Sequence, residues 1–181
     1  MKTTLVVLFL TALTLLSSNL TAQTGSIDNL FEKYAGKEGF TSVNISSDMF
    51  KLAAGMTSEG DLAKSKEIND IVSQLSGMKI LVYSSVNPKA PKIDFVKEIE
   101  KNIPMKQFSE LMTVQEKGSK VRFLTRPGSN NKISEMIMIA QSEGETVLMS
   151  FTGNLDLESI GKLSKTMNMK GMENLDKLNE K

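Results

Sequence analysis

The sequence contains neither cysteine nor histidine. These absences exclude Ser–His and Cys–His nucleophilic pairs, thiol redox chemistry, and zinc sites built on imidazole or thiolate ligands. Without cysteine, the chain can form no disulfide framework and cannot carry a lipid on a cysteine behind a leader. The reactive groups that remain are carboxylates, serines, lysines and two tyrosines. The sequence therefore favours a non-enzymatic protein that uses no cofactor and no metal.

A strong charge of either sign is also missing from the chain. Its 22 basic and 21 acidic residues give a net charge of +1, and both signs are interspersed along the sequence. A nucleic-acid-binding surface would need a basic stripe or patch, and the sequence has none. We therefore expect no nucleic-acid partner and no partner that is selected by charge alone.

The longest apolar run lies at the N-terminus, where residues 5–16 follow the positive charge of Lys2. Its length is typical of a signal peptide and falls short of the ~20 apolar residues of a membrane-spanning helix. We predict a signal peptide over residues 1–22, cleaved between Ala22 and Gln23, with a retained membrane anchor as the alternative. The mature chain would keep 21 of the 22 basic residues against 21 acidic ones. The expected location is the periplasm or the extracellular space, with no stable membrane span and not as a lipoprotein.

Turn residues divide the stretch between Leu111 and Gly153 into short segments with the alternation of β-strands. Such short links suit antiparallel neighbours, since parallel strands need a long crossover. We therefore predict an up-and-down meander of three to four strands, in which the continuously apolar Met136–Ala140 belongs to a central strand. The predicted strands are Met112–Lys117, Val121–Arg126, Ile133–Ala140 and Thr146–Thr152.

Further elements are predicted on both sides of this meander. Two earlier strands are expected at Phe40–Ser46 and Met78–Ser84. Helices are expected at residues 27–35, 48–54, 61–75, 92–103, 105–111 and 154–167, with Ser26, Ser47 and Asp156 as N-caps. Since a sheet must bury one face, the predicted fold class is α+β, with an antiparallel sheet covered on one face by helices. Residues 23–181 show no internal repeat and no linker, so they are expected to form a single domain.

Arg122 and Arg126 are the only arginines of the chain, and they share one face of a predicted strand. At a rise of ~3.3 Å per residue they lie about 13 Å apart, and they are weak candidates for an anion-binding site. The alternative is a solvated sheet face, or cross-strand pairing with acids such as Glu116 or Glu135. Two cationic side chains alone carry little specificity, so this alternative is favoured.

Metal sites are disfavoured in the same way. Asp156 and Glu158 offer oxygen ligands for a hard cation, but a helix cap and a charge at the positive helix end account for both. The methionines fall mostly on apolar faces, where methionine fills gaps in a core, and this argues against a thioether metal site.

Several motifs, taken in order along the chain, resemble those of a known family: Ala22-Gln23, Phe31–Tyr34, Thr41–Ser46, Met49-Phe50, Met78–Tyr83, Glu110–Met112, Lys132–Met136 and Ser150–Asp156. Together they make almost the whole mature chain similar to the domain-of-unknown-function family 4252 of Bacteroidota. The resemblance implies an α+β domain of the cell envelope and supplies no catalytic residue. Because relatives are encoded near sigma-factor genes, it also implies a connection with envelope signalling.

Three functions are compatible with these observations. The favoured one is an exported cell-envelope domain without enzymatic activity, which binds an envelope protein or an apolar ligand. The second is a component of an envelope-stress or sigma-factor-linked signalling system, and it depends on the resemblance alone. The third is a hydrolase that uses carboxylates, which requires two acids to converge in one cleft.

Overall fold

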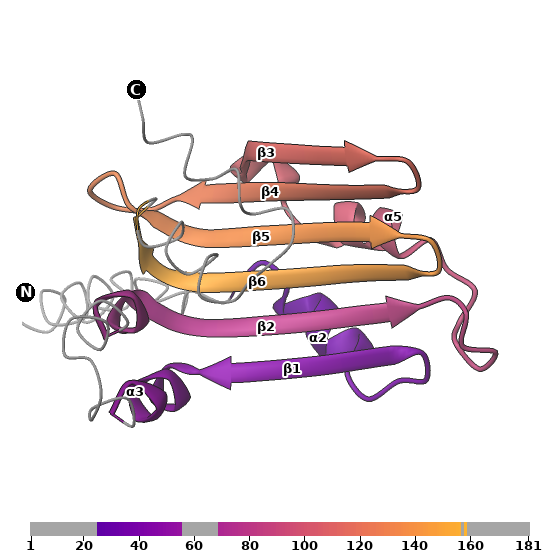
Figure 1. Ribbon diagram of the computed structural model, residues 1–181, viewed down its shortest axis with the longest axis horizontal. Helices are drawn as coiled ribbons and strands as arrows, with labels where there is room; N and C mark the ends of the chain where they lie inside the picture. Colours follow the sequence, from indigo (N-terminus) through magenta and orange to yellow (C-terminus); the bar gives the residue numbers. More distant parts are fainter. Residues whose placement is uncertain (1–24, 56–68, 157, 159–181) are drawn as a thin grey trace, which may run out of the picture.

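The computed structural model describes residues 25–55, 69–156 and 158. Six strands form one antiparallel sheet in the spatial order β1-β2-β6-β5-β4-β3, and helices pack against it (Figure 1). The predicted α+β class is confirmed. The strands are β1 Phe40–Ser46, β2 Leu75–Ser84, β3 Ser109–Glu116, β4 Ser119–Pro127, β5 Ile133–Ser142 and β6 Glu145–Leu155. The helices are α2 Asp28–Tyr34, α3 Ser47–Gly55, α5 Phe95–Asn102 and the short 3₁₀ turn η2 Met105–Gln107.

The predicted meander is confirmed by the pairing of β3, β4, β5 and β6, each with its neighbour in sequence. Gly118 and Gly144 make the tight turns between β3 and β4 and between β5 and β6, with φ of 81° and 80°. Such left-handed backbone is readily adopted by glycine. β2 pairs with β6, so the two early strands extend the sheet beyond the last strand of the meander. β5 and β6 therefore lie inside the sheet, as the apolar sequence Met136–Ala140 predicted.

Both faces of the sheet carry an apolar cluster. Successive side chains of a strand point to opposite faces, so a strand that is apolar at successive positions contributes to both clusters. On β5, Ile137 and Ile139 belong to one buried cluster, and Met136 and Met138 belong to another. Helices α2 and α5 cover the first cluster and lie behind the sheet in Figure 1. On the second face, Phe50 of α3 packs against the methionine-rich cluster. The structure thus buries more of the sheet than the single covered face that the sequence predicted.

An aromatic cluster fixes α2 and α5 to the first two strands. The rings of Tyr34 and Phe40 stack with centroids 4.6 Å apart, and Phe95 meets Phe40 edge-on at 5.2 Å. Tyr83 completes the cluster, and its hydroxyl donates to the carbonyl of Pro91 at 2.7 Å. Aromatic side chains bury large apolar areas, and such ring pairs add roughly 0.5–1.5 kcal/mol beyond the area term. These ring contacts therefore hold α2 and α5 against β1 and β2.

Two predicted helix caps are wrong. The N-cap of α2 is Ile27, which makes no side-chain cap bond, because Ser26 is held by groups of the sheet instead. At α3, the hydroxyl of Ser46 accepts the N–H of Met49 at 3.4 Å, in place of the predicted Ser47. Strand β1 runs without a linker into α3, so the last strand residue takes the capping role.

Three predicted helices end or begin elsewhere because strand pairing prevails over helical periodicity. Leu75 belongs to β2 and lies opposite Gly153 of β6, so the described helical residues, 69–74, end one residue before it. The expected helix over 105–111 is only the turn η2, because Ser109 starts β3. Asn154 and Leu155 extend β6, where Leu155 lies opposite Ile133 of β5.

Other predictions concern parts of the chain that the structure does not describe. The signal peptide and its cleavage between Ala22 and Gln23 lie outside the described residues, and so do the helix over 61–68 and almost all of the last helix. Among the residues described, no helix is both long and apolar enough to cross a membrane.

Candidate functional site

The face of the sheet that carries α2 and α5 changes from apolar to polar along its strands. On β6, for example, the buried Leu148 is followed on the same face by Ser150 and Thr152. On β5, Ile139 and Ile137 are followed by Glu135. We call this region the polar end of the sheet. It consists of Lys79, Arg126, Glu135, Ser150 and Thr152.

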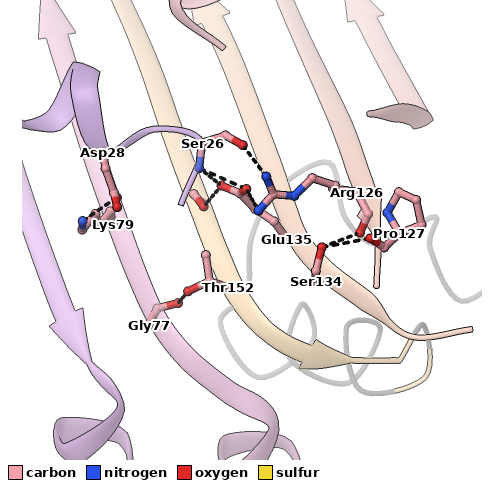
Figure 2. Close-up of polar contacts among 10 residues, drawn as sticks. Ser26, Asp28, Gly77, Lys79, Arg126, Pro127, Ser134, Glu135 and Thr152 are labelled. Atoms are coloured by element: carbon pink, nitrogen blue, oxygen red, sulfur yellow. Dashed lines mark hydrogen bonds and ion pairs between the residues drawn. The ribbon is translucent and has the colours of Figure 1, made fainter. Parts of the chain in front are cut away.

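The central group of the polar end is the carboxylate of Glu135, whose side chain is 0% exposed. Arg126 approaches it with Nη2 at 3.0 Å, and the hydroxyl of Ser150 donates to it at 2.7 Å. The backbone N–H of Ser26 donates to both carboxylate oxygens, at 2.9 and 3.1 Å. Figure 2 shows Ser26 and Arg126 pointing toward Glu135. The buried charge is thus compensated by a cation and by neutral donors, as a buried carboxylate requires.

Strand register brings these groups together. Arg126 lies directly opposite Glu135 across β4 and β5, and Ser150 lies opposite Ile137, next to Glu135 on the same face. The interpretation of Arg126 as a cross-strand partner of Glu135 is therefore confirmed. A second bond from Arg126, from Nη1 to Oγ of Ser26 at 3.2 Å, fixes the guanidinium plane.

Arg122 lies on the same face of β4 but has different partners. Its Nε bonds to Glu110 at 3.0 Å and its Nη1 to Glu100 at 3.2 Å. Neither Glu116 nor Glu135, the acids suggested by the sequence, takes this role for Arg122. Each of the two arginines is thus engaged by its own carboxylates, and anion binding by Arg122 and Arg126 stays a prediction.

The segment that precedes α2 lies across the polar end and is held at two points. Ser26 bonds to Glu135 and Arg126, and Asp28 forms an ion pair with Lys79 of β2 at 2.5 Å. Gly25 fits closely between Asp28 and Thr152, because a Cβ atom on Gly25 would lie 3.3 Å from both Asp28 Oδ1 and Thr152 Cγ2. We call residues 25–28 the N-terminal segment.

A groove with a cavity volume of about 310 Å³ opens beside the N-terminal segment. One wall is Gly25 and Asp28, and the others are residues 44–46 of β1, residues 76–79 of β2, and Ser150 and Thr152 of β6. Such a volume lies at the small end of ligand-binding pockets. Because the N-terminal segment forms one wall, the groove depends on the bonds that Glu135 makes to Ser26.

The chemistry of the groove is polar and close to neutral. Asn44 offers an amide, Ser46 and Ser76 offer hydroxyls, and the Asp28–Lys79 pair offers one charge of each sign. These groups suit a polar partner that both donates and accepts hydrogen bonds. The two acids beside the groove are each paired with a cation, Asp28 with Lys79 and Glu135 with Arg126.

The acids of α5 have structural roles. Glu98 accepts bonds from Lys33 at 2.7 Å and from the Tyr34 hydroxyl at 2.9 Å, which joins α5 to α2. The bond from Lys33, followed by that from Tyr34, holds the pKa of Glu98 below its usual range. Burial raises the pKa of the Tyr34 hydroxyl. Glu100 instead points to Arg122, so Glu98 and Glu100 diverge.

No group of three or more carboxylate, histidine or cysteine side chains suited to a metal occurs among the residues described. Asp156, which the sequence offered as a cap or a cation ligand, pairs with Lys132 at 2.9 Å.

Sequence reasoning missed the importance of Ser26, Asp28 and Lys79. One signal was available for Glu135, because it occupies an inward position in a strand whose other inward residues, Ile137 and Ile139, are apolar. A charged residue in such a position must find a partner.

Comparison with known proteins identifies the family of this chain but assigns no activity to it. No curated protein and no solved structure matches this chain. The model of the family described as a domain of unknown function, DUF4252, matches residues 34–163, which include all six strands of the sheet. The chain therefore belongs to the domain-of-unknown-function family 4252.

Proposed function

We propose that the protein is exported to the cell envelope and acts there as a non-enzymatic binding domain, whose partner occupies the groove beside the N-terminal segment. The apolar run and the cleavage region of residues 1–22 support export. The family match supports a conserved domain without an assigned activity.

The observation that carries the binding role is the composition of the groove. Hydroxyl, amide and backbone groups line it, together with one neutralised ion pair. These walls favour a polar partner, such as a segment of another envelope protein, over the apolar ligand that the sequence left open. The carboxylates of Asp28 and Glu135 are each paired with a cation, which favours a binding role over the carboxylate-based hydrolase.

Filling the groove tests this proposal. Ser76 is exposed and lines the groove, so Ser76→Trp places a large side chain there while leaving the bonds of Glu135 and Lys79 in place. The matched control is Gln115→Trp on the exposed face of β3, far from the groove in the sheet order. We expect the wild type and the control to retain the same partner from an envelope extract, and Ser76→Trp to lose it.

A partner retained equally by all three proteins would contradict the assignment of the groove, and recovery of no partner by the wild type would contradict the binding role. Circular dichroism of the variants establishes that each is folded. Export is tested separately by sequencing the N-terminus of the protein from the envelope fraction, which we expect to begin at Gln23.

A further inference from the structure

The two edge strands of the sheet differ in how they are protected from pairing with other strands. β1 and β3 form opposite edges (Figure 1). β3 carries the charged Glu110 and Glu116, and its register with β4 shifts between Glu110 and Met112. Charges and such irregularities prevent edge-to-edge association. β1, Phe40–Ser46, has no charged residue and no proline, and it pairs with β2 without a register shift over its full length. Within the described part of the chain, the outer edge of β1 is therefore unprotected against strand pairing.

The backbone groups available at this edge follow from the pairing of β1 with β2. The N–H of Ser84 donates to the carbonyl of Gly39 at 2.9 Å. Because alternate residues of an antiparallel pair exchange hydrogen bonds, residues 41, 43 and 45 direct their backbone groups to β2. Ser42 and Asn44 then direct theirs outward, and no strand in the described part of the chain pairs with that side of β1.

We propose that two copies of this chain associate through antiparallel pairing of their β1 strands about a two-fold axis at Val43. In this register Val43 lies opposite Val43, Thr41 opposite Ile45, and Ser42 opposite Asn44. One face of the pair then carries β-branched side chains and the other carries hydroxyl and amide groups, which are favourable cross-strand pairs. No like charges meet, because the strand has none. The edge is thus complementary to itself, as an isologous interface requires.

Exposed apolar side chains occur on β1 and on α3, the helix that follows it directly. Val43 is 39% exposed, and Met49 and Leu52 of α3 are 56% and 59% exposed. Since α3 follows directly after Ser46, the proposed register places the start of each α3 beside the start of β1 in the other copy. The pairing would therefore cover apolar surface as well as backbone groups. This inference does not depend on the proposed partner in the groove.

Sedimentation equilibrium of the purified protein tests the association. We expect the wild type to dimerise with increasing concentration. Val43→Lys places two like charges opposite each other, and we expect it to weaken the dimer by on the order of tenfold or more. The matched control, Gln115→Lys on β3, should dimerise like the wild type. Thermal melts within a few degrees of the wild type would show that both variants are folded. A wild type that stays monomeric, or a dimer that Val43→Lys leaves unchanged, would overturn the proposal.

The register is tested by a single introduced cysteine, because the chain has none of its own. Val43 of one copy would face Val43 of the other in a non-hydrogen-bonded pair, with Cα atoms about 4.5 Å apart, which is within disulfide range. We expect Val43→Cys to form a disulfide-linked dimer under mild oxidation, and Gln115→Cys to form no disulfide-linked dimer under the same conditions. Equal cross-linking of the two variants, or none at position 43, would overturn the proposed pairing.

Discussion

Replacing Arg126 by methionine tests whether the buried carboxylate of Glu135 depends on its cation. The substitution keeps a long apolar stem and removes the guanidinium that lies 3.0 Å from Glu135. The charge would remain buried with only the donors of Ser26 and Ser150. Removing one partner of a buried ion pair costs ~3–5 kcal/mol. Since the Arg126 side chain is 22% exposed, water can partly replace it, and we expect a loss of about 3 kcal/mol in the free energy of unfolding.

Urea denaturation followed by far-ultraviolet circular dichroism measures this loss, because the chain has no tryptophan to serve as a fluorescence probe. The midpoint should fall while the slope m stays the same, since the surface exposed on unfolding is unchanged. For a domain of this size, a loss of about 3 kcal/mol corresponds to a decrease in Tm of roughly 6–12 °C.

Arg122→Met is the matched control, because it removes a guanidinium from the same face of the same strand. Its partners Glu100 and Glu110 are 48% and 46% exposed, so we expect a loss below ~1 kcal/mol. The double variant Arg126→Met/Glu135→Leu removes the buried charge together with its cation and should be more stable than Arg126→Met alone. Equal losses for Arg122→Met and Arg126→Met would refute the reasoning.

Two further predictions concern other parts of the fold. Because the bonds from Lys33 and Tyr34 lower the pKa of Glu98 in the folded protein, their stabilising effect is present above the ordinary pKa of a glutamate. This stabilisation is lost as the pH falls through the lowered pKa of Glu98. Glu98→Gln should therefore flatten the acid side of a curve of the free energy of unfolding against pH, measured by urea denaturation. A curve that the substitution leaves unchanged would contradict this prediction. Gly153→Ala should lower the free energy of unfolding by about 1–3 kcal/mol, because its Cβ would meet the backbone carbonyl of Gln74. Gly36→Ala, where nothing lies within 4 Å but φ is +75°, should cost only about 1 kcal/mol, and a reversed order would argue against the close approach at Gly153.

The sequence was most informative where one local pattern was sufficient. Alternation alone predicted β1 at Phe40–Ser46 with the observed bounds, and short turns predicted the meander. Leu75 was wrongly placed in a helix because its strand conformation depends on pairing with β6, far away in sequence. Local periodicity does not report such long-range pairing.

The polar end of the sheet was predictable only in part. Alternation places Arg126 on the polar face of its strand, and the acid Glu135 was a candidate partner. The role of Ser26 was not predictable, because it depends on where the N-terminal segment crosses the sheet, 109 residues away in sequence from Glu135. Ser26 was instead interpreted as a local helix cap, which is the common role of serine before a helix.

The central claim is that Glu135 holds the N-terminal segment against the sheet and thereby forms the groove. Hydrogen exchange of the Ser26 amide tests this claim most directly, because that N–H donates to a fully buried carboxylate. We predict that the Ser26 amide exchanges slowly, at a rate close to that of the β5 amides, and that Glu135→Leu makes it exchange quickly. Exchange of the Ser26 amide in the wild-type protein at the rate of an unstructured peptide would contradict the account.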